Sequence, residues 1–303
     1  EFILESEMSI LVRTFCKGLL SIAYVPLFPK LLFKCTDENV IEAAFNDDSL
    51  SVISEQIVTP ETQSIEFANF IADLSISLKK FLPKNTIAIR FDPNVDFDSI
   101  EARDAFNYGL KMISYADRLK LSKNKVDIQP PDTTVINLLQ SEDEILANMH
   151  QKWRYNIRLS AKKGVEIKKY SKDSPQISQK LDKFYELTKI TNQRDGNASH
   201  SKSYYFDLIT SSFSENQKDS GPFINLYIAE HDGEEIASIM TLFNKTEAIY
   251  LYGASSNSKR NLMPNHLLQW TAILDAKEYG CQIYDMYGMP PDGDSENHPM
   301  HGL

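Results

Sequence analysis

The pattern of apolar and polar positions predicts strands and amphipathic helices in both halves of the chain. In the first half the predicted elements are strands over 8–14 and 21–26, a helix over 62–82, a strand over 86–91, a helix over 98–112 and a strand over 134–139. In the second half they are a helix from 141, a helix over 175–194, strands over 224–230, 235–243 and 247–253, a helix over 264–279 and a strand over 282–287, with a polar loop over 195–203 and an unassigned run over 204–213 before the strands. The chain is therefore expected to have an α/β (α+β) fold.

The two halves share one order of elements. Each has strands, an amphipathic helix, and a short strand whose acidic residue, Asp92 or Asp285, precedes a turn containing proline. This order predicts a duplicated α/β unit, with one domain over 1–139 and a second over 140–303. Two unrelated domains with a similar local order are the alternative.

The stretch from Ser141 to Tyr170 has the most distinctive pattern. Ser141 and Glu144 have the spacing of a capping box, and Gly164 is placed to end the helix. Apolar residues at every fourth position predict one buried stripe: Ile145, Met149, Trp153 and Ile157. Basic residues predict an exposed face: Lys152, Arg154, Arg158, Lys162 and Lys163. This face indicates either an anionic partner or a solvated surface.

Composition narrows these alternatives. The length of 303 residues favours two domains. The net charge of −10 makes the basic stretch a local exception in an acidic chain. This contrast fits one phosphate-binding patch better than binding of polyanions by the whole surface. Three cysteines without C-x-x-C spacing indicate reduced thiols in a cytosolic protein. No apolar run is long enough for a membrane span, and no signal peptide is visible.

Three kinds of catalytic site are not supported by the sequence. His298 and His301 have no further ligands at metal-binding spacing, so no metal site is predicted. The chain contains no G-x-S-x-G elbow and no Cys–His signature. The loop over 256–264 lacks the glycines that would bind a pyrophosphate, which argues against coenzyme A as the donor.

Two other groups of residues are candidates for chemistry. Asp92 follows an apolar strand, where its carboxylate could take a proton from an attacking amine or could form an Asx turn with Pro93. Tyr250 and Tyr252 alternate along a strand, which predicts that both phenols lie on one face and can bond a phosphate or carboxylate. The alternative for each tyrosine is a place in the core.

Several sequence runs together resemble the Fem (FemABX) family of non-ribosomal peptidyl transferases. These are WRYNIRLSAKKGVEI over 153–167, TNQRDGNASHSKSYYFDLI over 191–209, IYLYGASS over 249–256 with Lys259-Arg260, and IYDMYGMPP over 283–291. The run RFDP over 90–93 resembles the first domain of the same family. No long helical-hairpin insertion is visible, which favours the smaller, FemX-like type.

The resemblance implies a fold and an activity. The fold would be two tandem acetyltransferase-like (GNAT) domains, each a mixed sheet flanked by helices. The enzyme would be an aminoacyl-tRNA-dependent acyltransferase that moves an amino acid to the stem-peptide amine of UDP-MurNAc-pentapeptide or lipid II. Charged tRNA would be a co-substrate, and no cofactor or stable protein partner is implied. The bacterial cytoplasm, with peripheral contact at the inner membrane face, would be the location.

The resemblance also assigns residues. Tyr205 and Tyr252 match tyrosines that contact the nucleotide-sugar peptide, and Asp92 matches an acidic residue beside the acceptor end. A phosphate-binding arginine of the family falls at about Ser201, where Lys202 is the candidate substitute. We therefore expect Asp92 and Tyr252 to be catalytic. The expected substrate-binding residues are Tyr205, Tyr252, Lys202, Tyr250 and Arg260, and the basic face of 152–163 is expected to bind tRNA.

Two lysines of the family pattern, one that binds phosphate and one that stabilises the oxyanion, are expected before Glu1 and just beyond Leu303. Two other functions compete with the resemblance, namely an aminoacyl-tRNA–protein transferase and a nucleic-acid-binding module without activity. The sequence does not specify the amino acid, the form of the acceptor or the oligomeric state.

Overall fold

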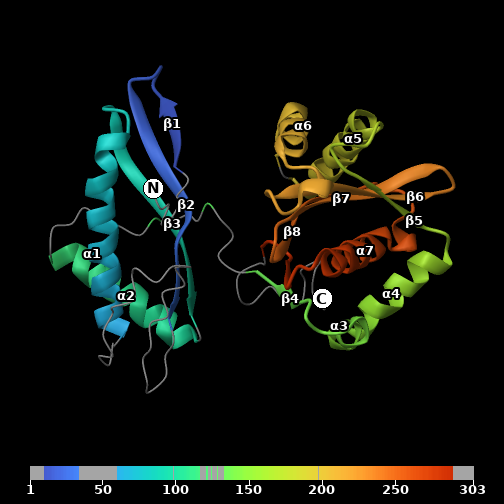
Figure 1. The fold of residues 1–303 in the computed structure, drawn as a ribbon, viewed down its shortest axis with the longest axis horizontal. Coiled ribbons are helices and arrows are strands. Elements are labelled where there is room, and N and C mark those ends of the chain that lie inside the picture. Colours follow the sequence, from blue (N-terminus) through green and yellow to red (C-terminus); the bar gives the residue numbers. More distant parts are fainter. Residues whose placement is uncertain are drawn as a thin grey trace. The chain divides into compact units, whose positions relative to one another are not determined.

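The computed structural model describes residues 10–33, 60–97, 99–116, 121, 124, 128, 133–196 and 198–288 (Figure 1). By its internal contacts the chain divides into two compact units, Glu1–Gln129 and Pro130–Leu303. Each unit contains one mixed sheet flanked by helices, as the sequence predicts.

The first unit is built on a three-stranded sheet in the order β1-β2-β3. Its elements are β1 (Leu11–Phe15), β2 (Leu20–Phe33), α1 (Pro60–Leu78), the 3-10 turn η2 (Lys79–Phe81), β3 (Thr86–Phe97) and α2 (Ile100–Ala116). β1 and β2 are antiparallel, and β2 and β3 are parallel. Phe67 and Ile71 of α1 pack with Phe106 of α2 into a buried cluster, against which Phe91 and Val95 of β3 also lie.

β3 is longer than predicted, and this changes the place of Asp92. The strand was expected to end at Asp92-Pro93, yet it continues to Phe97. Asp92 pairs with Pro26 of β2, and the pairing resumes at Asn94 after a shift in register. A proline without an N–H is tolerated in a sheet at such an irregularity. Asp92 therefore lies inside a strand.

The second unit is built on a six-stranded sheet in the order β4-β9-β8-β7-β6-β5. Its strands are β4 (Val135–Asn137), β5 (Glu166–Tyr170), β6 (Phe223–His231), β7 (Glu234–Phe243), β8 (Glu247–Ser255) and β9 (Ile283–Asp285). Its helices are α3 (Glu142–Asn148), α4 (Gln151–Lys162), α5 (Ile177–Asp195), α6 (Lys202–Ser211), α7 (Pro264–Tyr279) and the 3-10 turns η3 (Glu215–Gln217) and η4 (Arg260–Leu262). Only β8 and β9 are parallel among the described pairs of this sheet.

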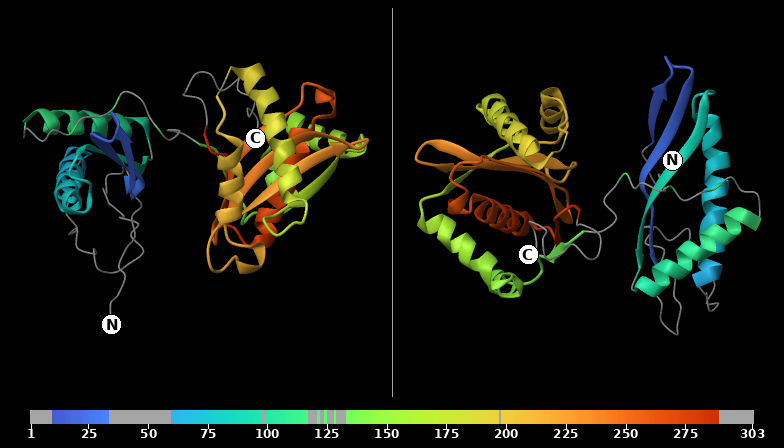
Figure 2. Two further views of the ribbon diagram at one scale, coloured as in Figure 1. Left: turned by 90° about the horizontal axis from the view of Figure 1, so that it is seen from above. Right: turned by 180° about the vertical axis from the view of Figure 1, so that it is seen from behind.

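The helices cover both faces of this sheet. α3, α4 and α7 lie on one face, and α5 and α6 lie on the other (Figures 1 and 2). Each face has its own buried cluster, one that includes Trp153 and Ile273 and one that includes Phe184 and Ile209. β4 pairs with β9 in this sheet, so the strand predicted for the end of the first domain belongs to the second unit.

The single helix predicted to begin at Ser141 is two helices, α3 and α4, in the structure. The capping box of Ser141 and Glu144 starts α3 as predicted, but α3 ends before Met149 and α4 begins after His150. The Arg154 guanidinium donates to the carbonyls of Leu146, Ala147 and Met149, the first two at 3.2 and 2.9 Å. The last carbonyls of a helix lack the N–H partners of its interior, so Arg154 caps α3, where the Leu146 carbonyl also accepts from the Met149 N–H at 3.2 Å. The predicted apolar stripe is buried throughout.

α4 packs against α7 through a half-buried histidine. The rings of Trp153 and His266 are 4.3 Å apart, and the Asn156 side-chain amide lies 3.1 Å from His266 Nε2. Burial, and to a smaller extent the charge of Lys152, lowers the pKa of His266 to about 4. The neutral imidazole is thus part of the contact between the two helices.

We predict that this histidine makes the protein less stable in acid. Since the unfolded chain takes up a proton at His266 near pH 6.5 and the folded chain only near pH 4, stability is unaffected above pH 6.5 and falls between these values. The loss should be on the order of 2 kcal/mol between pH 7 and pH 4. Urea unfolding at several pH values measures it, and His266→Gln should flatten the profile. Identical pH profiles for the two proteins would contradict the assignment.

Candidate functional site

Tyr250 and Tyr252 lie on opposite faces of the second sheet. Met240 of β7 pairs with Tyr252 and Thr241 pairs with Tyr250, so Leu251 is an extra residue in β8. Such a bulge reverses the side on which the following residues point. Tyr252 and Leu251 accordingly pack on the α5–α6 face, and Tyr250 packs on the α4–α7 face. The prediction that the two tyrosines share a face is wrong.

Tyr250 supports the backbone of β8. A Cβ on Gly253 would lie 1.9 Å from Tyr250 Oη, so the phenol occupies the space that any other residue at 253 would need. Burial raises the pKa of Tyr250 to about 12. Tyr250 is therefore a neutral packing residue, and it does not line the pocket in which Tyr252 lies.

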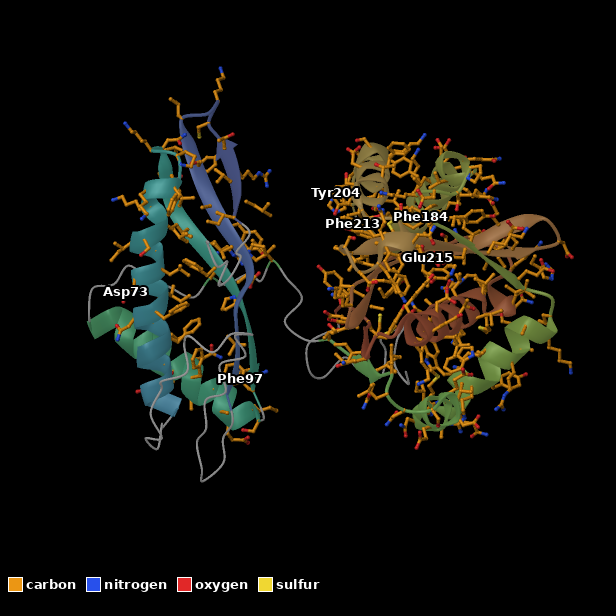
Figure 3. All side chains as sticks on the ribbon, viewed as in Figure 1. Asp73, Phe97, Phe184, Tyr204, Phe213 and Glu215 are labelled. Atoms are coloured by element: carbon orange, nitrogen blue, oxygen red, sulfur yellow. The ribbon has the colours of Figure 1, made fainter. Side chains whose placement is uncertain are left out.

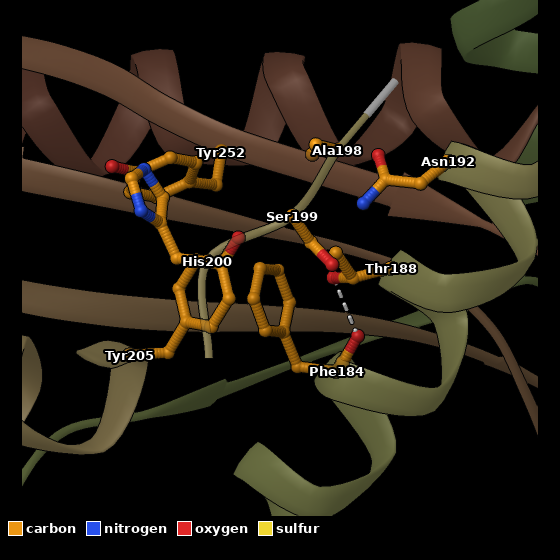
Figure 4. Close-up of a pocket in the computed structure, with 9 residues that line it drawn as sticks. Phe184, Thr188, Asn192, Ala198, Ser199, His200, Tyr205 and Tyr252 are labelled. Atoms are coloured by element: carbon orange, nitrogen blue, oxygen red, sulfur yellow. Dashed lines mark hydrogen bonds between the residues drawn. The ribbon is translucent and has the colours of Figure 1, made fainter. Parts of the chain in front are cut away.

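That pocket has a volume of about 340 Å³ and opens on the α5–α6 face (Figure 4). Its walls come from Phe184, Thr188 and Asn192 of α5, residues 198–200 of the following loop, Tyr205 of α6, and Tyr252 and Gly253 of β8. Residues separated by some sixty positions are thus brought together, because α5 and α6 both pack over the end of β8 where the bulge turns Tyr252 toward them.

Aromatic rings form the floor of the pocket. Tyr205 meets Tyr252 edge to face at 5.1 Å, and the hydroxyls of Tyr204 and Tyr252 are 2.9 Å apart. The imidazole of His200 stacks on Tyr204 at 4.1 Å. Burial raises the pKa of Tyr205, and burial together with the bond to Tyr204 raises that of Tyr252. Both phenols are therefore neutral near pH 7 and can donate hydrogen bonds to a developing negative charge.

Asn192 brings an unused donor to the same pocket. Its Nδ2 atom is buried without a hydrogen-bond partner, and in Figure 4 the amide points toward Ala198 and Ser199. An unsatisfied buried donor costs roughly 1–3 kcal/mol, so a ligand acceptor there would be favoured. Among the described residues that line the pocket there is no lysine, arginine or carboxylate. It therefore suits a neutral polar group, such as a peptide or sugar, better than a phosphate.

Hydrogen bonds connect the C-terminal end of α5 to the C-terminal end of β8 and the loop that follows it. Thr191 Oγ1 accepts from the Ser255 N–H at 2.8 Å and donates to the Ser255 carbonyl at 3.1 Å. Arg194 adds a hydrogen bond to Asn257 Oδ1 at 3.2 Å. These contacts fix the distance between Asn192 and Gly253 across the pocket. Sequence reasoning did not single out Asn192, Arg194 or His200, although all three fall in the run 191–209 that carries the family resemblance.

Lys202 and Arg260 lie outside this pocket. Lys202 is the first residue of α6 and pairs with Asp182 of α5. Ser201, where the family arginine was expected, caps α6 by accepting from the Tyr204 N–H at 3.3 Å. Arg260 is exposed in η4. The structure thus gathers Tyr205 and Tyr252 from the predicted substrate-binding set, and leaves Lys202, Arg260 and Tyr250 apart from them.

Asp92 belongs to the first unit. Its carboxylate is half-buried and accepts a hydrogen bond from the hydroxyl of Tyr24 on β2 at 3.0 Å. The carboxylate is thus held by a neighbouring strand in place of the Asx turn that Pro93 suggested.

The basic face of α4 is smaller than predicted. Arg154 is used to cap α3, and Lys163 Nζ donates to the Asn261 carbonyl at 3.2 Å. Within the described residues, no ion pair or hydrogen bond is recorded for the side chains of Lys152, Arg158 and Lys162, all of which are exposed. Tyr155, 60% exposed, lies among them on the same helix. We call these four residues the α4 stripe.

Basic residues after Gly164 also have partners. Lys168 pairs with Glu230, Lys169 with Glu215 and Asp275, and Lys172 donates to the Ser212 carbonyl. Lys168 and Lys169 are in β5 and Lys172 follows it, and none of the three is part of the stripe. His298 and His301 lie outside the described residues, and none of the described helices is long and apolar enough to cross a membrane.

Comparison with known proteins adds a family to this geometry. A model of the FemAB family matches residues 62–218 and 215–303. Lipid II:glycine glycyltransferase of Staphylococcus haemolyticus (strain JCSC1435) is 26% identical over 275 residues, which cover 70% of this chain and 63% of that protein. The chain thus spans less than two thirds of that relative's length. The protein of the same description from Staphylococcus aureus (strain COL) is 26% identical, with 78% and 68% covered.

A solved structure shares the fold. The crystal structure of FemX superposes with a TM-score of 0.61 at 20% identity, covering 95% of this chain and 77% of the other. At this identity the likeness concerns the fold alone.

We predict that Gly253→Ala destabilises the second unit because the new methyl group would collide with Tyr250 Oη. The cost should be roughly 1–3 kcal/mol, as for other overpacked sites. Tyr250→Phe removes the colliding oxygen, so the double variant should recover a large part of this loss. Urea unfolding of the wild type, both single variants and the double variant gives the coupling energy. Strictly additive effects would show that the contact does not exist.

Proposed function

The chain belongs to the FemAB family, and we propose that it transfers an amino acid from aminoacyl-tRNA to the stem-peptide amine of a peptidoglycan precursor, lipid II or UDP-MurNAc-pentapeptide. The relatives of 26% identity, which are described as lipid II:glycine glycyltransferases, support the transfer reaction and the class of acceptor. The dependence on tRNA is part of the proposal.

The neutral aromatic pocket is the observation that carries this proposal. In the reaction, the acceptor amine attacks the carbonyl carbon of the aminoacyl ester, the bond to the tRNA ribose breaks, an amide forms and the amine loses a proton. Because the ester is already activated, the protein has to align the two groups and stabilise the oxyanion. The Tyr252 phenol, whose pKa is raised by burial, is a donor of the required kind, the Tyr204 hydroxyl lies 2.9 Å from it, and the unpartnered Asn192 amide can hold a peptide carbonyl. No metal or covalent intermediate is needed.

Asp92 is proposed to bind the acceptor amine or to take its proton. Its carboxylate accepts a hydrogen bond from the hydroxyl of Tyr24 at 3.0 Å, which helps to fix its orientation.

The α4 stripe is proposed to contact the tRNA. Three exposed cations on one short helix can neutralise phosphates, and an exposed tyrosine among them can stack on a base or ribose. The net charge of −10 on the whole chain makes such a local patch the favoured point of approach for a polyanion. In this proposal the protein acts in the bacterial cytoplasm, peripherally at the inner membrane face, with charged tRNA as co-substrate and no other cofactor.

We predict that Tyr252→Phe lowers kcat/KM for the precursor about tenfold, since one hydrogen bond to a charged group is lost. Tyr204→Phe should have a similar effect, because its hydroxyl bonds that of Tyr252. The matched control is Tyr250→Phe on the opposite face of the same strand, which should leave kcat/KM near the wild-type value. Transfer of radiolabelled amino acid from a panel of charged tRNAs to UDP-MurNAc-pentapeptide and to lipid II measures these effects.

Other outcomes of this assay decide against the proposal. No transfer to either precursor by the full-length protein, with any charged tRNA, would make it wrong. Labelled product found instead on protein N-termini, identified by mass spectrometry, would indicate an aminoacyl-tRNA–protein transferase. Tight tRNA binding without any product would indicate a binding module.

We predict that replacing Lys152, Arg158 and Lys162 together by glutamine weakens tRNA binding. The slope of log K against log salt concentration should also become shallower by about 2–3, since each phosphate contact contributes close to one unit. Fluorescence titrations at several salt concentrations measure both quantities. A control of equal charge replaces Lys183, Lys189 and Lys245, which lie on α5 and in the β7–β8 turn. Equal effects of the two triple variants would show that only net charge matters.

A further inference from the structure

One end of the first unit exposes large apolar side chains. This end comprises the turn between β1 and β2, the last turn of α1 with η2, and the start of β3 (Figure 1). Leu19 is 74% exposed, and Ile76 and Phe81 are each 72% exposed. Leu139, at 74%, is the only other large apolar side chain so exposed among the described residues. The proposed transfer reaction uses none of the three at this end.

Hydrogen bonds hold the segments of this end together. Asn85 Nδ2 donates to the Gly18 carbonyl at 2.8 Å, and the Ser21 N–H donates to the Asn85 carbonyl at 3.0 Å. The Thr86 N–H donates to the Pro83 carbonyl at 2.9 Å, which turns the chain from α1 into β3. The apolar side chains are thus carried by turns whose backbone is bonded to neighbouring segments, and their exposure is a property of the fold.

The charged residues of these segments are all basic. Residues 10–33 and 74–91 include no aspartate or glutamate, although the net charge of the whole chain is −10. Four exposed lysines lie at the same end as the apolar side chains, namely Lys17, Lys79, Lys80 and Lys84. Lys80 Nζ is 4.8 Å from the centroid of the Phe81 ring, and within the described residues no carboxylate partner is recorded for any of the four. We call the three apolar residues and the four lysines the basic–apolar end.

This combination of side chains selects among possible partners. Protein interfaces are depleted in lysine, and a nucleic acid gains little from leucine or isoleucine, which have no ring on which a base can stack. An anionic bilayer matches both kinds of side chain, because its surface potential attracts lysine and its interfacial region takes up phenylalanine and leucine. An acidic chain is repelled by such a surface everywhere except at a local basic patch, so the patch also sets the orientation of approach.

We propose that the basic–apolar end docks on an anionic lipid bilayer. Leu19, Ile76 and Phe81 enter the boundary between headgroups and acyl chains, and the lysines lie at the lipid phosphates. The inference rests on the proposed function for its cellular setting, where it gives the peripheral contact with the membrane a specific surface. The docking itself needs neither tRNA nor acceptor. It is reversible and weakens with added salt, because part of the attraction is between exposed charges.

Sedimentation of the full-length protein with vesicles measures this docking directly. Vesicles of phosphatidylglycerol mixed with phosphatidylcholine are compared with vesicles of phosphatidylcholine alone. The partition coefficient should be at least about tenfold higher for the anionic vesicles at low salt, since each lysine near the surface adds to the attraction. Equal partitioning into the two kinds of vesicle would contradict the proposal.

Two variants separate the apolar contribution from the basic one. Leu19→Ser combined with Phe81→Ser should lower the partition coefficient into anionic vesicles about tenfold, because less apolar surface leaves water. Replacement of Lys17, Lys80 and Lys84 together by glutamine should lower it roughly hundredfold at low salt. All of these side chains are exposed, so neither variant removes a packed group.

Each variant has a matched control. Ile100→Ser removes an apolar side chain that is 56% exposed on α2, beyond Phe97 at the other end of β3 (Figure 3). Replacement of Lys111, Lys189 and Lys245 by glutamine removes the same charge from exposed positions elsewhere. Both controls should bind the anionic vesicles as the wild type does. All four proteins should transfer an amino acid to soluble UDP-MurNAc-pentapeptide at the wild-type rate.

The outcomes for docking and for the proposed function can be told apart. Vesicle binding as expected, without transfer to any acceptor, would leave the docking surface in place and overturn the proposed function. Transfer without vesicle binding would do the reverse.

Three further results would overturn the docking. Equal losses in the two triple lysine variants would show that only net charge matters. Weaker tRNA binding by the variant of Leu19 and Phe81 would assign the end to a nucleic acid. Dissociation of a dimer by the same variant, measured by light scattering, would show that a second copy covers it.

Discussion

The bulge at Leu251 is the constraint on which the arrangement of the second unit depends. In a regular strand Tyr250 and Tyr252 would point to one side of the sheet. The extra residue sends Tyr250 into the core beneath α7 and turns Tyr252 toward α5 and α6. The absence of a side chain at Gly253 is what lets the Tyr250 phenol lie against the strand at this point. One irregularity in β8 thus provides both a packed core residue and a pocket residue.

The basic surface of this unit depends on which of its cationic side chains are bound to neighbouring residues and which remain exposed. The basic residues between 152 and 172 are close together in the sequence, but in the folded protein they have three different roles. Arg154 neutralises the carbonyls at the end of α3, the lysines of β5 pair with carboxylates of neighbouring elements, and the α4 stripe remains exposed. A guanidinium bound to helix carbonyls is not free to bind phosphate, so the surface available to a polyanion is narrower than the count of basic residues indicates.

The pocket on the α5–α6 face combines donors from separate elements. Tyr252 comes from β8, Tyr205 from α6 and Asn192 from α5, and Nδ2 of the Asn192 amide is buried without a hydrogen-bond partner. Tyr204 supports Tyr252 through a contact between their hydroxyls at 2.9 Å. Phenol hydroxyls and an unpartnered amide suit the uncharged polar parts of a ligand, because no lysine, arginine or carboxylate is among the described residues that line this pocket.

The sequence by itself determined the α/β class, most helices, the apolar stripe of 145–157, the capping box at Ser141 and the family, because these depend on local periodicity and on runs of adjacent residues. The same runs singled out Tyr205 and Tyr252, which both line the pocket on the α5–α6 face. Only the tertiary structure decided that β3 continues through Pro93, that Tyr250 and Tyr252 lie on opposite faces of the sheet and that Arg154 caps a helix. Each of these features depends on the register of strand pairing or on a contact between separate elements. Register and such contacts cannot be read from the residues of one strand or helix alone.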